Sequence, residues 1–162
     1  MLHQFGQCVE EMDAHIAAID QRLAVRHKAS TASQRLSGVP GVGPITALTL
    51  VTKIDPGQFS SGRHFAAWLG LTPRERSTGG RTRLSGISQA GNDRLWQLLV
   101  LGATAVISHT KPERKTANAW LLKLLERRPR KLAAVALANK MARIVWAMMT
   151  NETAYRRVQP AA

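Results

Sequence analysis

The chain has 162 residues, which is enough for one domain with a hydrophobic core and too few for two large domains. Hydrophobic residues make up 44%, so wholesale disorder is excluded. The formal net charge is +13, which makes a nucleic acid the first partner to consider. The single cysteine, Cys8, excludes a disulfide framework and a cysteine-rich zinc site, and it fits a reducing cytoplasm.

The sequence gives no indication of export or of a membrane span. The apolar, uncharged run from Leu95 to Thr110 is shorter than the roughly 20 residues that cross a bilayer. The first residues lack the basic and apolar regions of a signal peptide. We therefore expect a soluble, cytoplasmic protein that does not contact a membrane.

The N-terminal segment predicts a helix with a heptad seam. Its apolar residues are spaced 4, 3, 4, 3 and 4 apart: Phe5, Val9, Met12, Ile16, Ile19 and Leu23. Such a seam pairs with a second copy as a coiled coil, giving a homo-oligomer, or docks on its own domain. A polar stretch at 28–34 follows, so we interpret residues 1–35 as the end of a coiled coil or a linker helix.

A glycine- and proline-rich turn comes next. The run Gly41-Val42-Gly43-Pro44-Ile45-Thr46-Ala47 fits the hairpin of a helix-hairpin-helix, in which the bare N–H groups of Gly41 and Gly43 favour a phosphate. An ordinary turn between two helices fits the run equally well. Pro44 suits the first turn of a helix.

The remaining segments predict an all-α, compact helical domain over residues 36–150 and a frayed tail at 151–162. We expect a helix from about Ser61 to Trp68, a loop or short irregular pieces over 70–92, and a central buried helix, apolar nearly all round, over 95–107. Two further helices are expected over 118–127 and 131–150. No alternating β pattern is evident, and the tryptophans are assigned to the core: Trp68, Trp96, Trp120 and Trp146.

The predicted loop over 70–92 carries the most suggestive chemistry. Ser77 lies in a glycine-rich stretch among arginines, which could neutralise charge on a phosphodiester that the serine attacks. Serine, threonine and glycine are also ordinary turn residues. The predicted phosphate-binding residues are Arg74, Arg76, Thr78, Gly79, Gly80, Arg81, Arg83 and Arg94.

A second basic cluster occurs in the last two predicted helices. It either binds backbone phosphates or forms a helix face that is exposed to solvent. It comprises Lys123, Arg127, Arg128, Arg130, Lys131, Lys140 and Arg143.

Metal chemistry is poorly supported. The carboxylates beyond the first helix form no close constellation, and the five histidines never pair at metal-ligand spacing. We expect no metal or other cofactor within this chain.

Several blocks together resemble the C-terminal domain of the insertion sequence 110 family of transposases. They occur in order from about Leu36 to Met149: Gly38-Val39-Pro40-Gly41-Val42-Gly43, Phe65-Ala66-Ala67-Trp68-Leu69-Gly70-Leu71-Thr72-Pro73, Ser77-Thr78-Gly79-Gly80, Gly86-Ile87-Ser88-Gln89-Ala90-Gly91-Asn92 and Ala136-Leu137-Ala138-Asn139-Lys140-Met141-Ala142-Arg143.

The resemblance implies a composite enzyme. In this family an N-terminal RuvC-like domain holds Mg²⁺, a coiled coil follows, and the C-terminal domain supplies a serine that becomes joined to DNA. A structured bridge RNA guides the choice of DNA. The nucleophile would be Ser77, with Ser85 and Ser88 as the alternatives. The RuvC-like domain is expected to be missing from this chain, which puts activity of the chain alone in doubt.

Two functions follow as hypotheses. The favoured one is the serine-bearing domain of a transposase, and the alternative is a non-catalytic DNA- or RNA-binding module. A structural helical adaptor is less favoured, because it leaves the basic charge unexplained.

Overall fold

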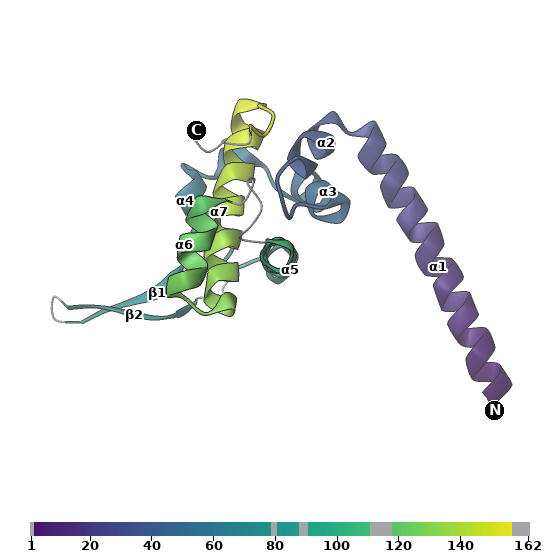
Figure 1. Cartoon of the computed structure of the whole chain (residues 1–162). Coiled ribbons are helices and arrows are strands. Elements are labelled where there is room, and N and C mark those ends of the chain that lie inside the picture. Colours follow the sequence, from purple (N-terminus) through teal and green to yellow (C-terminus); the bar gives the residue numbers. More distant parts are fainter. Residues whose placement is uncertain (1, 79–80, 88–90, 111–117, 157–162) are drawn as a thin grey trace.

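The computed structural model describes residues 2–78, 81–87, 91–110 and 118–156, with side chains over 4–73, 91–110 and 118–156 (Figure 1). Helices dominate, so the predicted all-α class is confirmed for the core. The elements in chain order are α1 (Leu2–Ala29), α2 (Thr31–Ser37), α3 (Pro44–Lys53), the 3-10 turn η1 (Pro56–Gln58), α4 (Gly62–Trp68), β1 (Pro73–Thr78), β2 (Arg81–Ile87), α5 (Asp93–His109), α6 (Ala119–Arg127) and α7 (Arg130–Asn151).

A β-hairpin replaces part of the loop predicted over 70–92. Strands β1 and β2 pair antiparallel over 73–87. The sequence did not predict this hairpin, because its strands are rich in arginine, serine and threonine. They lack the alternation of apolar and polar residues that is typical of a strand packed on a core.

Helix α7 is the centre of the core. The helices α2, α4, α5 and α6 all pack against it. Its buried residues recur every three or four positions: Ala133, Ala134, Leu137, Ala138, Met141, Ala142, Val145 and Met148. By length and composition α7 could cross a membrane, but nearly half of its most apolar window is buried inside the protein. Burial against four helices accounts for its apolar character.

Helix α5 is less buried than the sequence predicts. One stripe is buried, formed by Leu95, Leu99, Ala103 and Ile107, whereas Leu101 is 68% exposed. The predicted central helix is therefore present, but it is buried along one stripe only. The helix contacts α7 and α3 and leaves its remaining surface open.

Two glycines allow the turn before α3 to touch α5. Gly41 has a φ of +88°, which favours glycine, and a Cβ on Gly102 would lie 1.9 Å from the Gly41 carbonyl oxygen. The turn thus packs directly on the backbone of α5. Pro44 occupies the first turn of α3, as predicted.

Helix α1 projects from the rest of the molecule, and only its C-terminal end packs, against α2 and α3 (Figure 1). The polar stretch predicted as a linker is in fact partly helical, because the Ser30 side chain accepts a hydrogen bond from the Ser33 amide and caps α2. Ser33 is buried, and its hydroxyl lies 2.7 Å from Nδ1 of His27.

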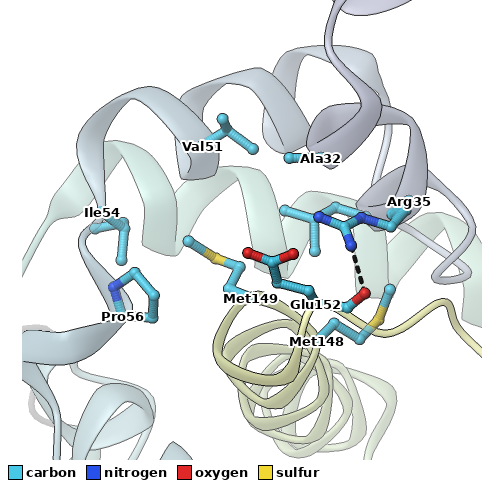
Figure 2. Close-up of a pocket in the computed structure, with 9 residues that line it drawn as sticks. Ala32, Arg35, Val51, Ile54, Pro56, Met148, Met149 and Glu152 are labelled. Atoms are coloured by element: carbon cyan, nitrogen blue, oxygen red, sulfur yellow. Dashed lines mark hydrogen bonds between the residues drawn. The ribbon is translucent and has the colours of Figure 1, made fainter.

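The C-terminal end of α7 closes on α2 and α3 around a hollow of about 200 Å³ with a mixed polar and apolar lining, shown in Figure 2. Its lining includes Val51, Met148 and Met149. Arg35 donates a hydrogen bond to the carbonyl oxygen of Glu152 at its edge. Tyr155, predicted to lie in a frayed tail, packs against the core; residues 157–162 lie outside the described residues.

The four tryptophans divide into two pairs. Trp146 is half-buried and donates a hydrogen bond to the Pro56 carbonyl at 3.2 Å, and Trp96 is half-buried against the core. Trp68 and Trp120 are 40% and 39% exposed. Trp68 packs against the core residues Phe59 and Phe65, so core packing holds for its inner side, while about two-fifths of the surface of Trp68 and of Trp120 is exposed.

The contact between Gly41 and Gly102 generates a stability prediction. Replacing Gly102 by alanine forces the turn away from α5, so we expect Gly102→Ala to lower the free energy of unfolding by about 1–3 kcal/mol in urea titrations. The control is Gly6→Ala, whose added Cβ meets nothing within 4 Å and whose stability should match or slightly exceed that of the parent. Equal stability of Gly102→Ala and the parent would refute the close contact.

Candidate nucleic-acid interface

The β-hairpin brings the candidate nucleophile and four arginines into one short ribbon. Thr78 pairs with Arg81 at the tip, and Ser77 pairs with Thr82. Gly79 and Gly80, which connect the strands, lie outside the described residues, as does the alternative nucleophile Ser88. Ser85, the other alternative, lies within β2.

The strand register concentrates positive charge. Arg76 pairs with Arg83, while Arg74 and Arg81 belong to the same ribbon. Glu75 is the single acidic residue between 73 and 87. Like charges at opposed positions destabilise a strand pair, so this register favours a bound anion.

The hairpin has little support from the rest of the protein. Among the described helices and strands, β1 and β2 contact only each other, and Figure 1 shows them projecting away from the helices. An isolated two-stranded hairpin is marginally stable in water. A polyanion lying along the ribbon would supply both countercharge and contact.

The root of the hairpin, in contrast, is fixed to the helical core. Gly70, with a φ of +75°, turns the chain at the end of α4. Leu71 is buried, and its amide donates to the Ala66 carbonyl at 3.0 Å. Asn139 of α7 donates from Nδ2 to the Leu71 carbonyl, also at 3.0 Å. Both backbone groups of Leu71 are thereby satisfied two residues before β1.

The returning chain is held just as closely. A Cβ on Gly91 would lie 2.0 Å from the Trp68 carbonyl oxygen, so this glycine allows the chain to pass the end of α4. Asn92 then caps α5, with its side chain accepting from the Leu95 amide at 3.0 Å. Arg94 lies exposed in the first turn of α5, next to the acidic residue Asp93.

The predicted phosphate-binding turn lies elsewhere. Gly41 packs on α5, so its backbone serves the core, whereas Gly43 is exposed and no atom would obstruct a Cβ there. In Figure 1 the region of α2 and α3 lies on the other side of α5 from the hairpin. The structure therefore brings Arg74, Arg76, Ser77, Thr78, Arg81 and Arg83 into one hairpin, which lies apart from the turn that contains Gly41 and Gly43.

The described residues do not fit a metal site, because no three of their histidine, cysteine, aspartate or glutamate side chains gather closely enough to hold an ion. A catalytic step through a metal is therefore not assigned to these residues.

Sequence reasoning gave no role to the residues that fix the hairpin root. Asn139 and Gly91 both occur in the blocks that resemble the transposase family, which is the signal that could have singled them out. Their roles depend on contacts of Asn139 with Leu71 and of Gly91 with the end of α4, which the sequence does not reveal.

Comparison with known proteins gives one consistent result. The sequence profile described as "Transposase IS116/IS110/IS902 family" matches residues 33–118, just over half of the chain. The chain is 47% identical over 156 residues to the "Putative transposase y4pF/y4sB" of Sinorhizobium fredii, covering 95% of this chain and 40% of the relative.

Two further relatives agree. The "Transposase for insertion sequence element IS1111A" of Coxiella burnetii is 41% identical over 145 residues, covering 89% of this chain and 40% of the relative. The "Transposase for insertion sequence element IS1328" of Yersinia enterocolitica is 36% identical over 158 residues, covering 96% of this chain and 46% of the relative. The chain spans less than half the length of these relatives. The profile match, the relatives and the ordered sequence blocks agree, and the chain belongs to the IS116/IS110/IS902 family of transposases.

Proposed function

We propose that this chain is the C-terminal domain of a DNA transposase, in which the serine hydroxyl of Ser77 attacks a phosphodiester. The observation that carries the proposal is the arginine-rich hairpin that projects from a fixed root. Ser77 and Thr82 share one face of this ribbon, and Arg76, Arg81 and Arg83 share the other. A DNA strand that crosses the edge of the ribbon would meet both the nucleophile and the guanidinium groups.

The proposed step conserves the phosphodiester bond energy. The Ser77 oxygen forms a bond to phosphorus, one P–O bond of the DNA strand breaks, and the departing deoxyribose hydroxyl takes up a proton. The serine proton passes to a base outside the described residues. The reverse attack by a second DNA end restores Ser77 and rejoins the strand, so no ATP is needed.

The basic residues of the hairpin and its flank would hold the phosphates. Arg74, Arg76, Arg81 and Arg83 would bind phosphates of the DNA strand, and Arg94 would add positive charge near the root. Thr78, Gly79 and Gly80 are proposed to contact the backbone at the tip.

The proposed partners are DNA, a structured guide RNA and a RuvC-like domain that carries Mg²⁺. The chemistry that the metal supplies there is activation of the phosphodiester. Absence of this domain would leave the chain able to bind DNA and unable to exchange strands.

The alternative function is a non-catalytic DNA- or RNA-binding module. The net charge of +13 favours it equally. The two functions differ in the role of Ser77. The transposase domain needs its hydroxyl as the nucleophile, whereas a binding module does not need it.

The hairpin arginines give the first functional prediction. Arg81→Gln with Arg83→Gln removes two phosphate contacts, which lowers the slope of log K against log salt by about 1.8 and weakens duplex binding about ten- to thirtyfold near 0.15 M salt. Fluorescence anisotropy with labelled DNA measures both quantities. The matched control, Arg22→Gln with Arg26→Gln on α1, removes the same charge and should leave the slope unchanged; equal effects of the two pairs would contradict the hairpin interface.

Ser77 gives the second prediction. When a RuvC-like domain of this family is fused ahead of the chain, with Mg²⁺, guide RNA and DNA substrates, we expect a DNA-linked species on a denaturing gel. Ser77→Ala should abolish this species and leave DNA affinity nearly intact, whereas Ser85→Ala should retain it. A species that persists in Ser77→Ala would assign the nucleophile elsewhere. The chain without the fusion should shift DNA in native gels and form no covalent species.

The seam of α1 gives the third prediction. Phe5, Val9, Met12 and Ile16 are each at least 57% exposed, and Ile19 is 47% exposed. A second copy pairing along this seam would remove it from water. We expect light scattering to report a dimer for the parent and 17.7 kDa for Ile16→Gln with Ile19→Gln.

Two alanines outside the seam supply the control for this experiment. Ala14→Gln with Ala17→Gln adds the same side chains to the opposite face of α1 and should remain dimeric. A monomeric parent at micromolar concentration would rule out pairing.

A further inference from the structure

A second basic surface lies on α6 and α7, away from the candidate nucleophile. The α6–α7 basic surface comprises Lys123, Arg127, Arg128, Arg130, Lys140 and Arg143. All are exposed except Lys140, which is half-buried. Lys131 is nine residues from Lys140, which places it on the opposite side of α7 and outside this surface. Glu126 is the one acidic residue between 118 and 151, so this segment contributes +6 of the net +13.

This composition differs from that of a solvated helix. Helix α1 balances four acidic residues with three basic ones, as a surface exposed only to water and salt commonly does. On the α6–α7 basic surface, cations closer together than the Debye length of about 8 Å repel one another without a nearby countercharge. A bound polyanion would relieve that repulsion.

The exposed side of α6 is organised as a stripe. Trp120, Lys123 and Arg127 follow one another at spacings of three and four, so they lie on one side of the helix. Leu121 is buried against the core. Packing of α6 on α7 therefore leaves the stripe open to a partner.

A cation–π contact joins the stripe to α7. The Lys140 ammonium lies 4.2 Å from the centroid of the Trp120 ring, which is 39% exposed. This contact restricts the long Lys140 side chain before any partner arrives, which reduces the entropy lost on binding.

The surface begins beside the root of the hairpin. Asn139, which donates to the Leu71 carbonyl, directly precedes Lys140. From Lys140 back to Arg130 the axis of α7 extends about 15 Å, which matches about four phosphates of one strand at 3.4 Å each. A backbone held at the hairpin could continue along this surface.

We propose that the α6–α7 basic surface binds the sugar-phosphate backbone of the nucleic acid that the hairpin engages. The proposal rests on the proposed function for the identity of the partner as nucleic acid, and it concerns different residues. Its contacts carry no sequence preference, because phosphates are the same along any strand. The surface therefore sets position and affinity, and the hairpin performs the chemistry.

The test compares two pairs of substitutions in the full chain. Lys123→Gln with Arg127→Gln should lower the slope of log K against log salt by about 1.8 on a labelled 30-bp DNA duplex, with a ten- to thirtyfold loss of affinity near 0.15 M salt. The control pair, Arg22→Gln with Arg26→Gln, should leave the slope unchanged. Equal slopes for the parent and the α6 pair, or equal losses for both pairs, would overturn the proposal.

Two additional arms separate the possible outcomes. The same titration on an RNA duplex shows whether the α6 substitutions reduce the affinity for DNA or for RNA more strongly. A reduced affinity for either nucleic acid supports the proposal. A competition experiment compares polyglutamate of matched charge with unlabelled duplex DNA. If polyglutamate displaces labelled DNA from the parent chain at the same concentration as the unlabelled duplex, the proposal is overturned. If Arg81→Gln with Arg83→Gln weakens binding and the α6 pair does not, this proposal fails while the proposed function stands.

Discussion

Burial of α7 is the constraint on which the rest of the structure depends. Because α2, α4, α5 and α6 all pack on this helix, its buried stripe fixes where each of them lies. The same helix presents Asn139 to the hairpin root and Lys140 to Trp120 one residue later. A shift of α7 would therefore disturb the core, the root of the hairpin and the α6–α7 basic surface together.

The fold separates stability from recognition. Apolar contacts among the helices and the close approach of Gly41 to Gly102 hold the core. The hairpin contributes nothing to that core among the described elements, and its paired arginines oppose its own stability. Segments that carry function are commonly drawn from the less stable parts of a protein, and a nucleic acid would supply the charge that the hairpin lacks.

The sequence predicted the helices well and the candidate site only in part. The spacing of apolar residues predicts helices α3, α4, α6 and α7, and prolines such as Pro44 and Pro129 indicate where helices begin. The hairpin was not predicted because neither face of its strands packs on the described core. Its sequence therefore lacks the alternation of apolar and polar residues that indicates a strand. Other features depend on contacts between distant segments, which local sequence patterns do not contain. Examples are the partly exposed rings of Trp68 and Trp120 and the hydrogen bond from Asn139 to the Leu71 carbonyl.

Hydrogen–deuterium exchange of the chain with and without duplex DNA shows whether the hairpin is the part of the protein that DNA engages. We expect DNA to slow exchange at the amides of β1 and β2, because a bound backbone would stabilise the marginal hairpin, while the amides of α3 stay unchanged. DNA binding that left the amides of both strands exchanging as in the free chain would contradict this expectation.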